Sequence, residues 1–398
     1  MVKKMICRHD PAVLVPDSIL DVAEGRLIRG KSVALKNGDI AGLLSSQERA
    51  AWVERERAQT VDLTGLTLLP GLIDCHVHFA LDGVDFNQAL ERWKDPAQME
   101  AHVKSAVAGF VEHGVLAVRD GSDIQGIGFR TKSSAAGSLV VRTTGFAIRR
   151  QGRYGTFLGP GVRDTAEAKR QIAQLARQGV DQIKVVVSGL VSFSQYGQVG
   201  PIQFSVPELK EIVRACHETG LPVMAHASSE AGVRTAVEAG VDSVEHGYFL
   251  SDASLEAMVQ KGTAWVPTLI PIAVQARKPY ADTHSPEGVC VLERTFRLQM
   301  EKIQKAVSLG VLLGIGTDAG AIGVRHGSSY FEEVQLFQEA GLSNGVILHM
   351  AIAHGAKIIG LEDRLGAVEP GKMACLLGIK GNPLSRLSAL EEVQVVVC

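Results

Sequence analysis

The stretch "TGLPVMAHASSEAGVRTAVEAGVDSVEHG" at residues 219–247 contains two copies of one junction, in which a helical run ends in glycine and a short apolar strand follows. Glycine readily adopts the left-handed conformation that closes many helices, so Gly220 and Gly240 are predicted helix ends. The junction recurs in "HGVLAVRD" (113–120), "QGVDQIKVVVS" (178–188), "KGTAWVPTL" (261–269) and "LGVLLGIGTDAG" (309–320). The repeat predicts strands that alternate with helices.

Two further segments bring the predicted strands to eight: "LLPGLIDCHVHF" (68–79) and "LVVRTTGFAI" (139–148). Ser205 and Asp164 each precede a Glu by three residues, which is typical of a helix start. Eight βα units over roughly 290 residues predict an α/β fold, a (β/α)8 TIM barrel at 66–362. A doubly wound open sheet is the alternative, but no glycine-rich phosphate loop follows an early strand.

The two flanks of the chain have a different character. Residues 1–65 and 363–398 contain short β-like pieces separated by turn residues, including "SVALKNGDIAGL" (32–43), "MACLLGIKG" (373–381) and "EEVQVVVC" (391–398). We therefore expect both termini to build one small, β-sandwich-like domain beside the barrel.

Composition narrows the functional classes. The 398 residues include 41 basic and 43 acidic ones, so the net charge of −2 gives no argument for binding nucleic acid or a membrane. Six cysteines without a CxxC motif suit a reducing cytoplasm, and no apolar run reaches the roughly 18–20 residues of a membrane span. We expect a cytoplasmic protein that acts on a small-molecule substrate. The sequence leaves open whether the protein forms a homo-oligomer.

Polar residues gather at the predicted carboxyl ends of the strands, where TIM barrels place their active sites. Alternate residues of a strand share a face, so His76 and His78 point the same way. The other strands contribute Lys184, His226, His246 and Asp318. Together these residues predict a metal site, although the two histidines of 76–78 alone could be satisfied core residues.

Lys184 lies in the apolar segment "QIKVVVSG" (182–189). A lone buried ammonium is costly, so the lysine is expected either to form a structural salt bridge or to lose its charge. A neutral amine can react with carbon dioxide to give an anionic carbamate, whose two oxygens can bridge two metal ions.

The set His-x-His, Lys, His, His and Asp on predicted strands one, four, five, six and eight resembles the binuclear form of the amidohydrolase superfamily. "LLPGLIDCHVHF", "VRDGS", "DQIKVVVSG", "VMAHASSEAGVRTAVEAGVDSVEHG" and "GIGTDAG" are similar to motifs of its prolidase, or Xaa-Pro and Xaa-Arg carboxypeptidase, subgroup. "LGAVEPGKMACLLGIKGNPL" resembles that subgroup's closing β-segment, and departs from it at Cys375.

The resemblance implies two divalent metal ions, with zinc expected and manganese, iron or cobalt as substitutes. His76, His78 and Asp318 would hold the first ion, His226 and His246 the second, and carboxylated Lys184 would bridge them. A hydroxide between the metals would cleave the C–N bond of an amide, such as a dipeptide or N-acyl amino acid. Asp318 would be the catalytic residue, taking the proton of the hydroxide and passing it to the leaving amine.

Loop residues are candidates for substrate contacts. Tyr196, in "SFSQYGQVG" (192–200), is expected either to donate a hydrogen bond to the substrate or to pack, and His326 either to contact substrate or to fix its loop. Arginine pairs well with carboxylates, so the cluster after the third strand predicts an anionic substrate group unless those side chains are simply solvated: Arg149, Arg150 and Arg153. Arg119 and Asp120 are expected to form a structural ion pair or to contact substrate.

Rival functions use the same fold. A mononuclear deaminase would pair a histidine with a nearby glutamate after the fifth strand and would lack Lys184. Here Glu230 lies four residues past His226, a spacing that matches the deaminase pattern poorly, and Lys184 is present. A cyclic amide hydrolase is a second alternative, and a non-catalytic binding or assembly protein is a third. A non-catalytic member tends to lose metal ligands, and none is missing from this sequence.

Overall fold

The computed structural model describes residues 4–398. Seven short strands form two parallel sheets in the middle of the chain. One sheet contains β7 (Leu72–Val77), β8 (Val115–Asp120) and β9 (Val140–Thr143). The other contains β10 (Ile183–Val186), β11 (Val223–Ala227), β12 (Ser243–His246) and β13 (Ala264–Val266). Nearly every residue of these strands is buried, as expected for parallel sheets covered by helices.

Isolated parallel bridges connect the edges of the two sheets. Ile148, just past β9, pairs with Val185 of β10. The segment 311–319, which the sequence predicted as the eighth strand, is bridged to β13 through Leu313 and to β7 through Ala319. It forms no regular ladder, yet its backbone exchanges hydrogen bonds with both neighbours, and the Asp74 carboxylate of β7 accepts bonds from the Thr317 hydroxyl (2.6 Å) and N–H (3.0 Å).

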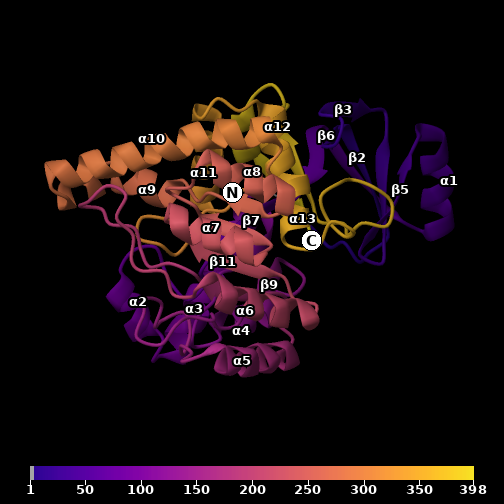
Figure 1. Ribbon diagram of the computed structural model, residues 1–398. Coiled ribbons are helices and arrows are strands. Elements are labelled where there is room, and N and C mark those ends of the chain that lie inside the picture. Colours follow the sequence, from indigo (N-terminus) through magenta and orange to yellow (C-terminus); the bar gives the residue numbers. More distant parts are fainter. Residues whose placement is uncertain (1–3) are drawn as a thin grey trace.

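Helices follow most of these strands and cover the sheets from outside (Figure 1). They are α2 (Phe86–Arg92), α3 (Pro96–Glu112), α4 (Ile127–Ser134), α5 (Thr165–Gln178), α6 (Val206–Glu218), α7 (Glu230–Ala239), α8 (Asp252–Lys261), α9 (Ile270–Gln275), α10 (Pro286–Leu309), α11 (Ser328–Glu339), α12 (Asn344–His349) and α13 (Gly355–Ile358). Short 3-10 segments are Tyr280–Thr283 and Leu387–Glu391, and a π-turn spans Met350–His354.

The helix boundaries follow the chemistry read from the sequence. Asp164 caps α5 by accepting the N–H of Glu167, and Ser205 forms a reciprocal capping box with Glu208 at the start of α6. Gly179 and Gly240 end α5 and α7 in the left-handed region, at φ of 80° and 86°. The predicted glycine junctions are confirmed.

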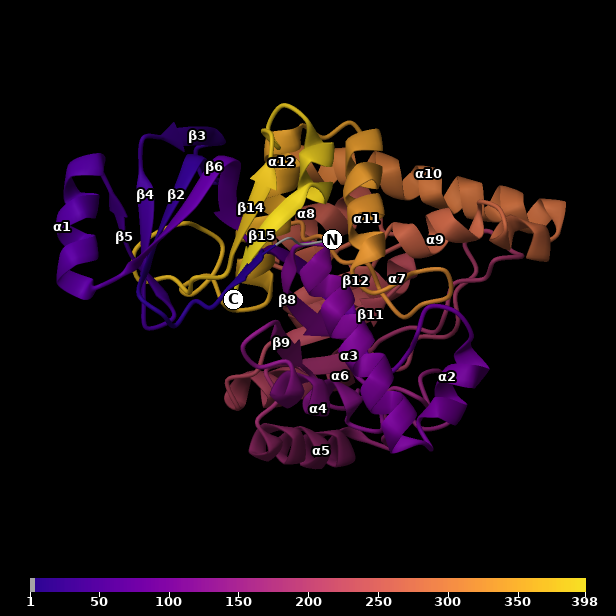
Figure 2. The ribbon, with the colours of Figure 1, turned by 180° about the vertical axis from the view of Figure 1, so that it is seen from behind.

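Strands from both ends of the chain share one sheet, which Figures 1 and 2 show beside the helical layer, with the indigo N-terminal strands next to the yellow C-terminal ones. Its order is β1-β15-β14-β6-β2-β4-β5, with β3 paired to β2. The strands are β1 (Lys4–Ile6), β2 (Ala12–Asp21), β3 (Arg26–Arg29), β4 (Ser32–Lys36), β5 (Asp39–Leu44), β6 (Gln59–Pro70), β14 (Leu376–Lys380) and β15 (Val393–Val397). Helix α1 (Ser46–Glu56) contacts β2 and β5.

We expected a β-sandwich-like domain, in which two sheets face each other. The strands from the two termini are instead hydrogen-bonded into a single sheet. Strand β6 pairs in parallel with β2 and antiparallel with β14, and it runs past the expected boundary at residue 65 to Pro70. Only Gly71 separates it from β7, and the Gly71 N–H donates to the Cys375 carbonyl at 2.9 Å. The sheet and the strand that carries His76 and His78 are therefore nearly continuous.

Within residues 4–398, no helix combines the length and the apolar character that crossing a membrane would require.

Candidate metal centre

Strand β7 positions the first two histidines. All six of its residues are buried, and the alternation of the strand turns His76 and His78 to one side. Cys75 lies on the opposite face, where its Sγ is 4.0 Å from the Gly355 carbonyl oxygen and is packed in the core. The strand thus directs two imidazoles into the space that the sheets enclose.

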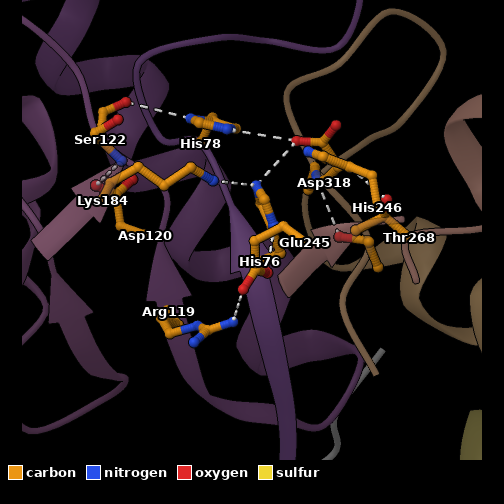
Figure 3. Close-up of polar contacts among 12 residues, drawn as sticks. His76, His78, Arg119, Asp120, Ser122, Lys184, Glu245, His246, Thr268 and Asp318 are labelled. Carbon is orange, nitrogen blue, oxygen red and sulfur yellow. Dashed lines mark hydrogen bonds and ion pairs between the residues drawn. The ribbon is translucent and has the colours of Figure 1, made fainter. Parts of the chain in front are cut away.

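Glu245 fixes the orientation of the His76 ring. Its Oε2 lies 2.8 Å from His76 Nδ1, and its Oε1 accepts from the Arg119 guanidinium at 2.8 Å and the Ser243 hydroxyl at 2.6 Å (Figure 3). Glu245 and Arg119 are almost completely buried, and the cost of burying their charges is offset by these contacts and by the bonds that Arg119 donates to the Cys75 carbonyl oxygen at 2.6 Å and the Ser243 hydroxyl at 2.9 Å. Arg119 therefore pairs with Glu245, and the ion pair expected between Arg119 and Asp120 is not formed.

Asp318 completes a compact group with the two histidines. Its Oδ1 lies 3.5 Å from His76 Nε2 and 3.4 Å from His78 Nε2. One ligand atom from each of these three residues lies within 4.8 Å of the others, so within residues 4–398 they form a group of side chains that could hold a metal ion. His78 Nδ1 faces the Ser122 carbonyl oxygen at 3.2 Å, which leaves its Nε2 for the shared space.

His226 and His246 lie beside this group. Their ring centroids are 4.5 Å apart, and the His246 ring is 5.0 Å from that of His76. His246 Nδ1 is 2.7 Å from the Thr268 hydroxyl, so its Nε2 remains available. His226 Nε2 lies 3.5 Å from the Gly189 carbonyl oxygen, which leaves Nδ1 as the nitrogen able to bind an ion.

Lys184 of β10 reaches the same space from the side opposite Asp318 in Figure 3. Its Nζ is 3.3 Å from His76 Nε2, and the residue is 1% exposed. Burial lowers the pKa of the Lys184 amine to about 8, although the Glu245 and Asp318 carboxylates act in the opposite direction. Burial therefore makes the neutral, nucleophilic amine more accessible than it is in an ordinary exposed lysine.

The titration of these groups suits metal ligation. Burial lowers the pKa of His78 and of His226 to about 3, and it lowers those of His76 and His246 well below the ordinary value. Neutral imidazole is the form that binds metals, and one nitrogen of each ring is already held by a neighbour. Four such rings and a carboxylate form a donor set that fits divalent transition-metal ions.

The backbone is strained around this group. Six non-glycine residues within 4–398 have positive φ, and four of them lie here: Ser122 (92°), His246 (69°), Thr268 (49°) and Asp318 (57°). Such conformations cost free energy and persist where the surrounding contacts over-determine them. At Asp318 one of these contacts is its N–H bond to the His76 carbonyl oxygen, at 2.7 Å.

A cavity of about 830 Å³ opens above these residues. Its floor includes His78, Lys184, His226, His246 and Asp318. Tyr154, Tyr248 and Ser228 also line it, and the Ser228 hydroxyl is buried without a hydrogen-bond partner within residues 4–398. A small molecule in the cavity would therefore contact the histidines, the lysine and the aspartate together.

The residues predicted to contact substrate lie in different places. Arg153 lines the cavity. Arg149 is buried and donates to carbonyl oxygens of its own loop, including that of Gly159 at 2.6 Å, while Arg150 pairs with Glu208. Neither Arg149 nor Arg150 lines the cavity, since their guanidinium groups stabilise the loop that carries them.

Tyr196 and His326 also lie outside the lining of the cavity. The Arg294 guanidinium sits 3.6 Å from the centre of the Tyr196 ring, which is a packing contact on the surface of the loop. His326 Nε2–H donates to the His78 carbonyl oxygen at 3.1 Å, and the ring stacks on Phe79 with a centroid distance of 5.8 Å. His326 thus holds its loop against the end of β7.

Several residues of the site were not singled out from the sequence. Glu245 contacts His76 Nδ1, and Thr268 contacts His246 Nδ1. Tyr154 and Tyr248 line the cavity together with the histidines. A signal existed for Glu245, which directly precedes His246 and is a charged residue in a buried strand. Nothing in the spacing of Tyr154 distinguishes it from an ordinary loop residue.

A model of the amidohydrolase family matches residues 67–398. The chain belongs to the amidohydrolase family. Members of this family generally use metal ions, which agrees with the cluster of His76, His78 and Asp318. The resemblance read from the sequence motifs is confirmed.

Several known proteins are similar to this amidohydrolase. Ochratoxinase of Aspergillus niger is 26% identical over 417 residues, which cover 94% of this chain and 83% of the relative. A solved Xaa-Pro dipeptidase with methionine bound in its active site is 26% identical, with a TM-score of 0.82, and the alignment covers 97% of this chain and 98% of that one. An uncharacterized protein of Mycobacterium tuberculosis is 28% identical over 327 residues, 79% of this chain and 83% of its own.

Proposed function

We propose that this amidohydrolase cleaves a C–N amide bond with two divalent metal ions, expected to be zinc. The observation that carries the proposal is the convergence of His76 Nε2, His78 Nε2 and an Asp318 oxygen within 4.8 Å. The proposal includes a closed (β/α)8 barrel, which the bridges at Ile148, Leu313 and Ala319 support. In such a barrel the three ligands and the remaining strand ends face one opening.

The chain offers ligands for two ions. His76, His78 and Asp318 would hold one, His226 and His246 the other, and Lys184 as a carbamate would bridge them, which is supported by its Nζ lying 3.3 Å from His76 Nε2. When bound, the two ions would supply Lewis acidity that lowers the pKa of water and polarises the scissile carbonyl.

Asp318 is placed to move the proton. It touches both histidines of β7 and lines the cavity, so its carboxylate can accept a proton from the attacking water and donate it to the leaving amine. Burial raises the pKa of Asp318 to about 7, which keeps the two protonation states close in free energy near neutral pH. Tyr154 and Tyr248 are positioned over the same floor and can donate hydrogen bonds to a carbonyl oxygen.

The family and the cavity support one substrate class for this proposal. A dipeptide or an N-acyl amino acid contains both an amide and a carboxylate, and Arg153 is the guanidinium that lines the cavity to meet that carboxylate. The prolidase-type neighbour acts on an Xaa-Pro dipeptide, in keeping with this class.

The test combines metal analysis with an activity panel. Metal-loaded protein is expected to contain about two ions per chain and to release amines from dipeptides or N-acyl amino acids. Lys184→Ala should lose most of the metal and the activity, whereas Lys132→Ala, which removes a lysine paired with Asp181 away from the cavity, should lose neither. Full metal content and normal turnover in Lys184→Ala would refute the carbamate.

The same panel separates the alternatives. Lactams in the panel test for a cyclic amide hydrolase, and ammonia released from aminopurines or aminopyrimidines tests for a deaminase. Ammonia release with no cleavage of any amide would refute the proposal and identify a deaminase instead.

A further inference from the structure

The walls of the cavity are apolar, in contrast to its floor. Above the histidines, its lining consists mainly of aliphatic and aromatic side chains, contributed by the loops after β7, β9 and β10 and by the segments after β13 and after 311–319. These side chains are Leu81, Val84, Phe86, Phe157, Leu158, Leu190, Val191, Phe193, Ile272 and Ile322. A small polar substrate would leave most of this surface in contact with water.

Part of the apolar lining is exposed at the mouth. Val84 is 61% exposed, Phe86 36%, Leu190 56% and Ile322 45%, and all four line the cavity. Nine large apolar side chains within residues 4–398 are exposed to this extent, so nearly half of them gather around one opening. Single exposed apolar residues are ordinary, but a cluster around a concave site is typical of ligand binding. We call these four residues the apolar rim.

Aromatic rings connect this rim to the floor. Phe86 packs edge-on against Phe157 with centroids 5.1 Å apart, and Phe157 packs in the same way against Tyr154 at 5.9 Å. Tyr154 in turn lies 5.6 Å from the His226 ring. One wall is therefore a run of three aromatic side chains that leads from solvent to a proposed metal ligand.

Charge is scarce on the walls. Asp82 is paired with Arg92 at 3.0 Å and accepts the N–H groups of Val84 and Asp85, so its charge is already compensated. Arg153 is exposed, and its side chain forms no ion pair within the part of the chain that the structure describes. The walls of the cavity therefore carry one uncompensated positive charge, that of Arg153, and are otherwise mainly apolar.

We infer that the substrate carries a bulky apolar group, alkyl or aryl, on one side of its amide bond, and that the apolar rim and the Phe157–Tyr154 wall bind this group. The inference rests on the proposed amide hydrolysis and narrows its substrate class. Phe86, Leu190 and Ile322 are then specificity-determining residues, because they contact the group that distinguishes one amide from another.

The test uses two matched series of amides on metal-loaded protein. The first varies the acyl group on a fixed alanine from acetyl through butanoyl and hexanoyl to benzoyl. The second keeps acetyl and varies the amino acid from alanine through norvaline to phenylalanine. Burial of one methylene group is expected to raise kcat/KM about three- to fourfold in whichever series places its apolar group on the walls.

Variants assign the effect to the walls. Phe86→Ala and Leu190→Ala should flatten the rise of kcat/KM along that series while the metal content per chain stays at the wild-type level. Val259→Ala removes a side chain of similar exposure (44%) on α8, outside the lining of the cavity, and should leave the series unchanged.

A binding measurement separates this inference from the proposed function. Butanoate, hexanoate and octanoate share one carboxylate, so calorimetric Kd values on metal-loaded protein report the contribution of the chain alone. Absence of turnover in both series would refute the proposed amide hydrolysis, yet an affinity that rises with chain length would still support apolar recognition. Flat Kd values together with flat kcat/KM in both series would overturn it.

Discussion

Glu245→Gln is expected to weaken metal binding although Glu245 is not itself a proposed ligand. Its Oε2 accepts a hydrogen bond from His76 Nδ1–H at 2.8 Å, and its Oε1 accepts hydrogen bonds from the Arg119 guanidinium and the Ser243 hydroxyl. Glutamine has the same shape but a single acceptor oxygen, so its NH2 group must face either His76 or the Arg119 guanidinium. One of the two carboxylate contacts becomes a contact between donors, and the His76 ring loses its fixed tautomer or its position.

The magnitude follows from the role of such supporting carboxylates. Replacing the partner of a ligating histidine typically weakens metal affinity about 10- to 100-fold, which corresponds to about 1.4 to 2.7 kcal/mol. Competition between the metal-free protein and a chromophoric chelator measures this loss directly, without any substrate. We expect Kd for the ion that His76 would hold to rise by that factor in Glu245→Gln.

Glu333→Gln provides the matched control. Glu333 is also a completely buried carboxylate, and it accepts the N–H groups of Leu269 and Ile270 at 2.9 and 2.7 Å rather than a histidine N–H. Both variants should lose stability, since each leaves a buried group poorly paired. Only Glu245→Gln should lose metal affinity, and equal Kd values for the two variants would show that Glu245 has no orienting role.

Three further predictions concern turnover, pH and packing. Asp318→Asn should reduce kcat by several orders of magnitude, because it removes a proposed ligand and the proton carrier together; a steady-state assay showing near-normal kcat would exclude both roles. Burial raises the pKa of Glu333 to about 8 from its ordinary 4.5, so the native state binds more protons than the unfolded chain between these values. The free energy of unfolding should therefore fall as pH rises from 4.5 to 8, by at most about 1.4 kcal/mol per pH unit from this group, and urea titrations across this range should show a shallower fall in Glu333→Gln. Gly159→Ala should lower the thermal midpoint, because the added Cβ would lie 2.0 Å from the Ala147 carbonyl oxygen; Gly345→Ala on α12, with no atom within 4 Å of the added Cβ, should keep or raise it, and equal midpoints would contradict the packing argument.

Local rules account for what could be predicted from the sequence. The parity of a strand decides that His76 and His78 share a face and that Cys75 does not, and capping chemistry decides where α5 and α6 begin. These rules act over a few residues, so one chain suffices to read them. The polar residues at the strand ends could be found in the same way.

Loop conformation and pairing across the fold could not be predicted. Arg149 and Arg153 lie four residues apart in one loop, but only Arg153 lines the cavity, because the loop folds back and uses the Arg149 donors for its own carbonyl groups. Arg119 pairs with Glu245, from a different sheet, and no spacing rule connects residues so far apart. The sequence therefore identified which residue types were present, while the tertiary contacts determined their roles.

The position of β6 between β2 and β14 also constrains how the chain can fold as it leaves the ribosome. β2 is made before β6, but β14 follows roughly 300 residues later, about 15 to 60 s of synthesis at typical rates. During that time one edge of β6 has no partner, and unpaired edges readily add strands from other chains. The pairing has a very high sequence separation, which makes it intrinsically slow to form. Strand β14, made long after β6, is the one that covers this edge next to the histidine-bearing β7.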